Sequence, residues 1–175
     1  MEINMKNHIW MCLLAGAALL FMSGVVTAGT HLLDDAKGLF EARQYDKAIS
    51  LVEKEIRKSG ESADLLVMMA DCYAALEKTG KAEKIYRQAL ALDPGHQEGS
   101  LNLGMLLVAK RERNEAIALF KKVLNEKPDH ARAHFCLGMA YNARADINDA
   151  FGQYKILKRL DKKLAEKLYN AIFLK

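Results

Sequence analysis

The stretches ALALDPGHQE (residues 89–98) and VLNEKPDHAR (residues 123–132) present the same order of residue types: apolar and polar residues, a proline, one further residue and a histidine. Their prolines, Pro94 and Pro128, are the only two in a chain of 175 residues, and they stand 34 positions apart. A proline ends a helix and is tolerated in the first turn of the next, where its missing N–H group costs nothing. The repeated phrase therefore predicts a helical unit with a period of 34 residues.

Four windows follow this period without an insertion: residues 29–62, 63–96, 97–130 and 131–164. The eighth and twentieth places of the windows always hold small residues: Ala36, Ala70, Gly104 and Gly138, then Ala48, Ala82, Ala116 and Ala150. The eleventh and twenty-fourth places always hold bulky residues: Leu39, Tyr73, Leu107 and Tyr141, then Val52, Tyr86, Phe120 and Tyr154.

Each window predicts two amphipathic helices, because its apolar residues recur at spacings of three and four in two stretches. Two helices cross closely only where small residues meet, and bulky residues then fill the space beside the crossing. A glycine inside a helix costs about 1 kcal/mol relative to alanine, so Gly104 and Gly138 indicate a close approach. We expect Gly138 to face Ala150 at such a crossing, and the fold class to be all-α.

The pattern Leu103-Gly104-x-x-Leu107, followed by Ala116, Phe120 and Pro128, resembles the tetratricopeptide repeat. The same pattern recurs one period later in Leu137, Gly138, Tyr141, Ala150 and Tyr154. The resemblance implies a right-handed superhelix of helix-turn-helix units. Residues 29–62 are then a degenerate first repeat, because Asp35 and Glu55 replace the usual apolar residues. The second to fourth repeats are residues 63–96, 97–130 and 131–164. The tryptophan of the family is absent.

A closing helix is predicted for residues 161–175, where Leu164, Leu168 and Ile172 are spaced by four and Asp161 can cap the start. We expect it to cover the apolar end of the stack. Tyr169 and Phe173 leave open the alternative that this end is a dimer contact.

The N-terminal region has the features of a signal peptide. Residues 9–26 form an uncharged, largely apolar run that follows Lys6, and the small residues Val26 and Ala28 precede a cleavage site after Ala28. We favour a cleaved signal peptide, residues 1–28, and a periplasmic or secreted protein. The alternative is an uncleaved anchor in the inner membrane formed by residues 9–26, a run just long enough to span a bilayer.

The sequence argues against an enzyme, because it has no phosphate-binding loop and no catalytic triad or inward carboxylate pair that this architecture would assemble. We expect no cofactor and no metal: His130 and His134 occupy a turn place and a core place. Cys72 and Cys136 lie a whole repeat apart, too far for a disulfide. The net charge is +4, and removal of residues 1–28 leaves it unchanged. The acidic and basic residues of the chain are interspersed, so we expect no nucleic-acid partner.

The resemblance implies that a partner binds in the concave groove lined by the first helix of each repeat. The groove-facing places then hold Leu33, Lys37, Phe40, Val67, Asp71, Ala74, Leu101, Met105, Val108, Phe135, Met139 and Asn142. Some of these residues alternatively contact a neighbouring repeat. The basic and amide set with which some relatives grip a C-terminal carboxylate is missing, since its places hold Val67, Leu101, Met105 and Cys136.

We therefore predict a non-enzymatic scaffold that binds an apolar peptide or helix of another protein, with Leu101, Met105, Phe135 and Met139 as one apolar strip. Assistance in the assembly of an envelope complex is the process we expect. The alternative is a structural protein that self-associates, for instance as a homodimer, through its C-terminal helix.

Overall fold

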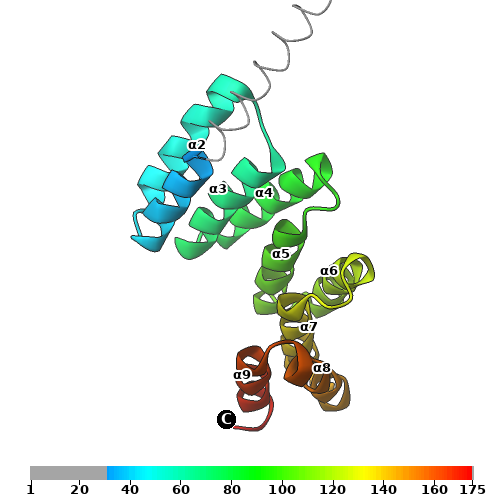
Figure 1. The fold of residues 1–175 in the computed structure, drawn as a ribbon. Helices are drawn as coiled ribbons and strands as arrows, with labels where there is room; N and C mark the ends of the chain where they lie inside the picture. The colour runs from blue at the N-terminus through cyan, green and yellow to red at the C-terminus, as the bar shows by residue number, and fades with distance from the viewer. Residues whose placement is uncertain (1–30, 175) are drawn as a thin grey trace, which may run out of the picture.

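The computed structural model describes residues 31–174, and the predicted signal peptide or anchor lies outside this range. All regular secondary structure in the described range is helical (Figure 1). A first helix, described over residues 31–41, is followed by α2 (Tyr45–Ser59), α3 (Ala63–Ala75), α4 (Thr79–Leu92), α5 (Gln97–Ala109), α6 (Arg113–Glu126), α7 (Ala131–Ala143), α8 (Ile147–Leu160) and α9 (Lys162–Phe173). None of the helices within residues 31–174 has the length and apolar character needed to cross a membrane.

Each window holds two helices joined by a short turn, and the turn repeats in atomic detail. One non-glycine residue in each turn has a positive φ, between 57° and 68°: Arg43, Glu77, Arg111 and Ala145, all at the fifteenth place. The amide of the next residue then donates to the carbonyl of the bulky eleventh place, at 2.8–2.9 Å. This bond is the six-to-one bond of a Schellman motif, which satisfies a free carbonyl at the helix end.

The repeated proline phrase forms the turn between windows. The second helix of a window ends two residues before Pro94 or Pro128, and the next helix begins three residues after it, at Gln97 or Ala131. Neither proline therefore lies in the first turn of the next helix, although a proline is tolerated there. His96 and His130 are the N-caps instead, since their Nδ1 atoms accept hydrogen bonds from the amides of Gly99 and Ala133, at 3.0 and 3.3 Å.

The small places of all four windows are buried, and every alanine among them is fully inaccessible. Gly104 lies directly against the ring of Phe120, so a side chain there would displace the ring. Gly138 is covered by the closing helix. Its closest neighbours are Leu168 of α9 and Cβ of Gln153, because α9 packs across this position.

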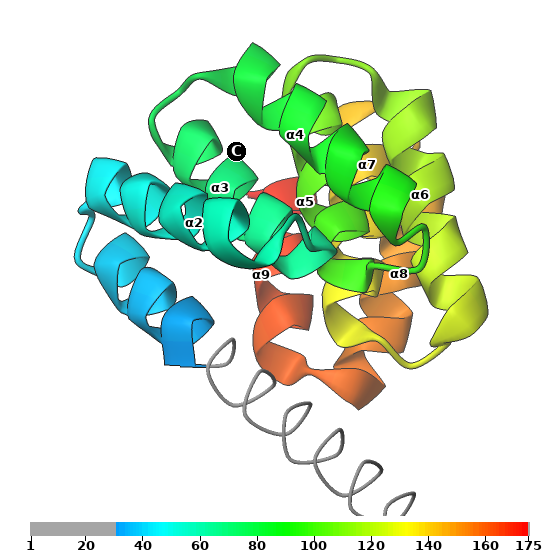
Figure 2. The same cartoon turned by 90° about the horizontal axis from the view of Figure 1, so that it is seen from above.

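Helix α9 closes the stack. It begins after one residue, Asp161, whereas four residues separate α6 from α7, and the Asp161 carboxylate accepts a hydrogen bond from the Leu164 amide at 3.0 Å. Leu168 and Ile172 are buried where α9 packs on α7 and α8. Seen from above, successive helix pairs are rotated relative to one another, so the stack is a superhelix (Figure 2).

Candidate partner-binding groove

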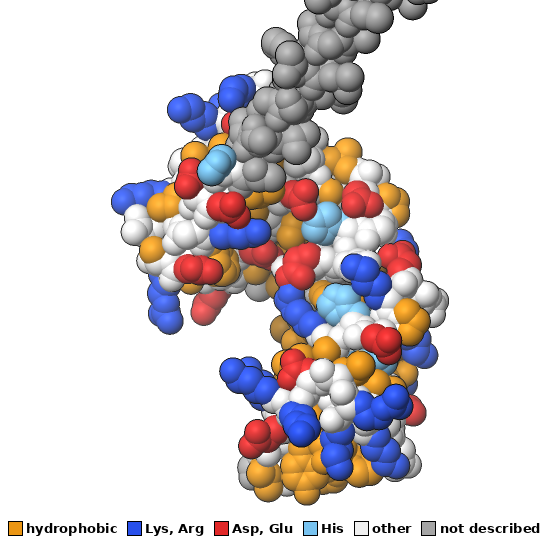
Figure 3. Space-filling view, viewed as in Figure 1, with side chains coloured by type: hydrophobic (Ala, Val, Ile, Leu, Met, Phe, Trp, Pro, Cys, Tyr) orange, Lys and Arg blue, Asp and Glu red, His pale blue; other side chains and the backbone are white. Residues whose placement is uncertain are grey.

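Two adjoining pockets lie on the inner side of the superhelix. One has a volume of about 510 Å³ and the other about 460 Å³. They share Phe40, Asp71 and Glu98, which come from the first helices of windows one, two and three. Because these residues belong to both pockets, the two pockets are neighbours, and we call them together the groove. The space-filling view shows a hollow between the part of the molecule that holds α2–α4 and the part that holds α7–α9 (Figure 3).

The apolar walls of the groove come from half-buried residues. Leu33 and Phe40 stand on the first described helix, and Met105 and Leu106 stand on α5. Phe40 is held by an edge-to-face contact with Tyr45, with ring centroids 5.3 Å apart. These side chains retain part of their apolar surface in water, which a ligand can bury.

A polar network crosses the groove and connects three windows. Asp71 of α3 accepts a hydrogen bond from the Tyr86 hydroxyl of α4 and one from Asn102 Nδ2 of α5, the latter at 2.7 Å. The Asn102 carbonyl oxygen accepts from Arg132 at 2.6 Å, and Arg132 also pairs with Glu98. Successive repeats are thus joined by side chains along the groove floor.

Burial raises the pKa of the Asp71 carboxyl above its ordinary value, and the hydrogen bonds from Tyr86 and Asn102 offset only part of this effect. Burial, assisted by the neighbouring Asp71 charge, also raises the pKa of the Tyr86 hydroxyl. Tyr86 therefore stays a neutral donor to Asp71. At one rim of the groove, His96 Nε2 lies 3.0 Å from a carboxylate oxygen of Asp64.

The sequence-predicted site residues fall into three groups. Leu33, Lys37, Phe40, Asp71, Ala74 and Met105 line the groove and are not fully buried. Val67 lines it too but is only 4% exposed. Leu101 is fully buried and lines neither pocket, so an exposed apolar strip cannot include it. Val108, Phe135, Met139 and Asn142 are half-buried and line neither pocket. Asn142 donates to the Ala171 carbonyl of α9 at 3.0 Å.

The sequence did not lead us to predict the polar residues that line the groove: Asp64, Tyr86, His96, Glu98, Asn102 and Arg132. A signal for three of them exists: Glu98 and Asn102 interrupt an apolar helix at a spacing of four, and Arg132 stands one period after Glu98. Tyr86 could not be found in this way, because its bulky place predicts a core residue and only the structure brings its hydroxyl to Asp71.

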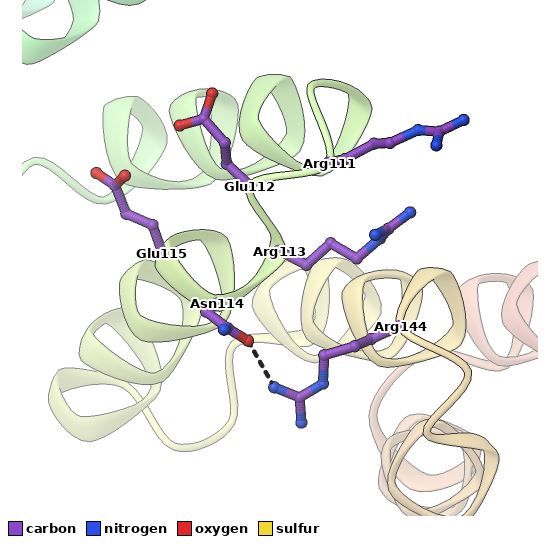
Figure 4. A pocket seen from close by; sticks show the side chains of 6 residues that line it. All are labelled: Arg111, Glu112, Arg113, Asn114, Glu115 and Arg144. Carbon is purple, nitrogen blue, oxygen red and sulfur yellow. Dashed lines mark hydrogen bonds between the residues drawn. The ribbon is translucent and has the colours of Figure 1, made fainter.

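Another pocket, of about 420 Å³, lies at the turns of windows three and four (Figure 4). Its lining residues are Arg111, Glu112, Arg113, Asn114, Glu115 and Arg144. Arg144 donates to Asn114 at 2.9 Å, and Glu115 accepts from Arg87 at 2.7 Å. The guanidinium groups of Arg111 and Arg144 point in different directions, so these cations do not converge on one ligand.

The buried thiols are structural. Cys72 and Cys136 are both free and at most 2% exposed, and burial raises the pKa of each to about 11. A thiol with such a pKa is a poor nucleophile at neutral pH. Both ring nitrogens of His134 lie 2.7 Å from protein oxygens, those of Gln153 and Pro128. Within residues 31–174, no cluster of three or more His, Cys, Asp or Glu residues has the geometry to hold a metal ion.

Two sequence models described as tetratricopeptide repeat match the chain, one over residues 33–96 and one over residues 75–134. Together they cover more than half of it. The chain belongs to the tetratricopeptide repeat family. Its fold is the right-handed superhelix of helix pairs that the sequence pattern implied. Membership makes the chain a protein-interaction scaffold, since repeats of this family are in general non-enzymatic interaction modules.

Solved structures agree on the fold. YrrB, described as a TPR protein with an unusual peptide-binding site, has a TM-score of 0.67 and 23% identity, over 77% of this chain and 71% of YrrB. A thermophilic TPR protein of Thermus thermophilus has a TM-score of 0.71 and 18% identity, over 82% of both chains. A MamA structure has a TM-score of 0.64 and 21% identity, over 77% of this chain and 74% of MamA. No curated protein matches the chain significantly.

Proposed function

We propose that this TPR protein binds an extended or helical segment of another protein in its inner groove. The observation that carries the proposal is the adjacency of the two pockets, which share Phe40, Asp71 and Glu98 in their lining. Each pocket has the volume of a small-molecule site, enough for a few side chains. A partner segment with two apolar anchors, one for each pocket, fits this arrangement.

The apolar anchors supply most of the affinity in this proposal. Phe40 is the wall common to both pockets, Leu33 belongs to one and Met105 to the other. A buried apolar anchor contributes about 1–3 kcal/mol to an interface, and a few such residues usually dominate. The predicted residues Val108, Phe135, Met139 and Asn142 then make at most peripheral contacts.

The polar network supports binding by preorganisation. Asp71, Asn102 and Arg132 fix the relative positions of α3, α5 and α7, so the groove walls do not have to be ordered by the partner. A preformed site avoids part of the entropic cost of association. The similarity to YrrB, whose description includes a peptide-binding site, is compatible with a peptide ligand, although identity at this level carries the fold alone.

We further propose that the protein works in the cell envelope, either free in the periplasm or secreted after cleavage behind Ala28, or held by residues 9–26. The role we propose for it there is assistance in the assembly of an envelope complex. The mass of the intact protein tests the location: a chain that begins at Gly29 supports export with cleavage, and one that begins at Met1 excludes cleavage.

Site-specific photo-crosslinking in the producing cells tests the groove. A crosslinker placed at Phe40 or Met105 should capture one protein, because both side chains line the groove. The same crosslinker at Gln88, exposed on α4 and outside both pockets, is the matched control. Capture of the same protein with equal yield at Gln88 would contradict binding in the groove.

Self-association through the closing helix is the second candidate function, and the exposure of Tyr169 and Phe173 is the observation in its favour. Light scattering of the purified protein decides it. A dimer mass that returns to the monomer in a Tyr169→Ser, Phe173→Ser variant would establish this role, and a monomer mass excludes it.

A further inference from the structure

The end of the stack formed by α8 and α9 carries an exposed cluster of aromatic rings. Phe151, Tyr154, Tyr169 and Phe173 contact one another, with ring centroids 4.9–5.9 Å apart. Tyr169 is 39% exposed and Phe173 is 47% exposed. Figure 3 shows hydrophobic side chains gathered at this end of the molecule, with Lys and Arg side chains beside them. We call these four residues the aromatic end.

Exposed apolar residues are concentrated in the same region. Among the described residues, the large hydrophobic side chains that remain exposed are Leu92 and then, all within α8, α9 and the residue after α9, Ile147, Ile156, Leu160, Tyr169, Phe173 and Leu174. Scattered single residues of this kind need no explanation, but a contiguous cluster marks a contact surface.

The positive charge of the protein lies at the same end. Residues 151–175 hold seven Lys and Arg against two acidic residues, a net charge of +5, so the remaining residues have a net charge of −1. Within residues 31–174, no carboxylate lies within ion-pair distance of the cations Lys155, Lys158, Arg159, Lys162, Lys163 and Lys167. These charges are therefore available to an anionic partner.

The cations adjoin the rings. Lys155 Nζ lies 5.0 Å from the centroid of the Phe151 ring, and Lys158 Nζ lies 5.9 Å from that of Tyr154. A pocket of about 270 Å³ opens between Tyr154 and Tyr169, and its lining also holds two cations, Lys158 and Lys162, and one carboxylate, Glu166. Apolar and cationic groups are thus interleaved within one surface.

This surface does not accept a further helix of the same repeat. Tyr169 is the eighth residue of α9, and the eighth residues of α3, α5 and α7 are Ala70, Gly104 and Gly138. Those small residues permit the close packing of each helix pair, whereas a tyrosine ring at the same place prevents it. The aromatic end is therefore exposed for a different kind of contact.

We propose that the aromatic end docks on an anionic membrane surface. Tyrosine rings and lysine side chains are the groups that suit the boundary between lipid tails and headgroups, since each joins an apolar body to a polar end. Lysines close to a negatively charged lipid surface add an electrostatic attraction. None of the four aromatic residues lines a groove pocket, so the protein can contact lipid and bind a partner segment at once.

Charge and the shape of the surface favour a membrane over two other occupants, a second copy of this chain and a partner helix. A second copy that docked by the same face would bring two regions of net charge +5 together, which opposes association. A partner helix requires a row of pockets for anchors at successive turns. The aromatic end offers one small pocket between Tyr154 and Tyr169. A planar lipid surface needs no such row.

Vesicle co-sedimentation tests the proposal with the chain as isolated from the producing cells. Binding to vesicles of phosphatidylcholine is compared with binding to vesicles in which a third of the lipid is phosphatidylglycerol, at low and at high salt. The pure phosphatidylcholine vesicles account for any binding by the uncharged residues 9–26. We expect the anionic vesicles to bind at least about tenfold more protein at low salt, and high salt to remove the difference.

Three variants assign the contact to its residues. Lys158→Glu with Lys162→Glu, and Tyr169→Ser with Phe173→Ser, should each remove most of the preference for anionic vesicles. Lys54→Glu with Lys84→Glu changes the charge equally on exposed residues of α2 and α4, and should keep most of the preference. Thermal melting confirms that each variant is folded.

Equal binding to the two kinds of vesicle would overturn the proposal, as would an equal loss in the Lys54, Lys84 variant. A dimer mass in light scattering that the Tyr169, Phe173 variant abolishes would assign the surface to a second copy. Saturable capture of an acidic protein at this end, without vesicle binding, would assign it to that protein.

Discussion

Four equivalent residues, Arg43, Glu77, Arg111 and Ala145, adopt the left-handed backbone conformation that glycine tolerates best. Each is the second residue after a helix, where the chain reverses into the next helix, and none is a glycine. A non-glycine residue in this region costs about 1–3 kcal/mol. The protein therefore carries strain at the same place in every repeat, and the strain can be relieved at one turn without a change in packing.

Ala145→Gly should stabilise the protein by about 1 kcal/mol and raise the Tm by about 2–4 °C, because the gain from relieved strain exceeds the added entropy of the unfolded chain. Ala118→Gly is the matched control, since Ala118 is exposed inside α6, where the same substitution should cost about 1 kcal/mol. Calorimetry measures both. A lower Tm for Ala145→Gly would show that this turn is not strained.

Asp71→Asn should change the pH dependence of stability. Burial raises the pKa of Asp71 in the folded state, so its contribution is fully present below the ordinary value of 3.8 and is lost as the pH rises through the higher folded pKa. Asparagine keeps an oxygen in place of the Oδ1 atom that accepts from both Tyr86 and Asn102, and it never ionises. The Tm of Asp71→Asn minus that of the native protein should therefore increase with pH.

Thermal melts from pH 3 to pH 7 measure this difference, with Asp129→Asn, in an exposed turn, as the control for the loss of one charge. A difference that falls as the pH rises would mean that the hydrogen bonds to the Asp71 carboxylate outweigh its burial.

At the scale of the helices, the small places decide how closely the elements approach. Gly104 accommodates the Phe120 ring of its own repeat, whereas Gly138 accommodates Leu168 of the closing helix. The difference arises because a single residue, Asp161, joins α8 to α9 and brings α9 across the last helix pair. The closing helix is therefore part of the core of the fourth repeat.

Gly138→Leu should destabilise the protein by about 1–3 kcal/mol, because the new side chain overlaps Leu168 and forces α9 to move. Gly152→Leu should be neutral or slightly stabilising, since a Cβ at that position meets no atom of another element within 4 Å and leucine favours a helix over glycine. Denaturant unfolding measures both.

The double variant Gly138→Leu, Leu168→Ala separates overlap with α9 from a general effect at position 138. It should recover part of the stability lost in Gly138→Leu, because the smaller residue makes room for the new side chain. Fully additive losses would show that Leu168 is not the neighbour that matters.

At the scale of the molecule, the sequence was sufficient for the repeat but not for the site. The period set by Pro94 and Pro128, and small residues such as Ala70 and Ala82, predict the helices and their register, because close packing leaves few alternatives at those places. The capping role of His96 depends on the geometry of the turn, and the packing of Leu168 against Gly138 depends on where the closing helix lies. Neither is encoded in the local pattern.

The groove was predicted in part. Phe40 and Met105 were expected on the groove side because the position of a residue in the repeat decides which face of its helix it occupies. That face can be predicted from the sequence of the helix alone. Leu101 was expected on the exposed strip but is buried, because the depth at which a helix is buried depends on the next repeat. The Asp71 network was missed because it joins residues from three repeats, and its members are near one another only after the superhelix has formed.

Methionine methyl NMR tests directly whether a partner segment occupies the inner groove. The described residues include four methionines: Met68 and Met105 line the groove pockets, and Met69 and Met139 do not. With the segment identified by crosslinking, we expect large chemical-shift changes for the methyl groups of Met68 and Met105 on titration, and small ones for Met69 and Met139. Large changes at Met69 or Met139, with Met68 and Met105 unaffected, would contradict binding in the groove and place the binding surface elsewhere.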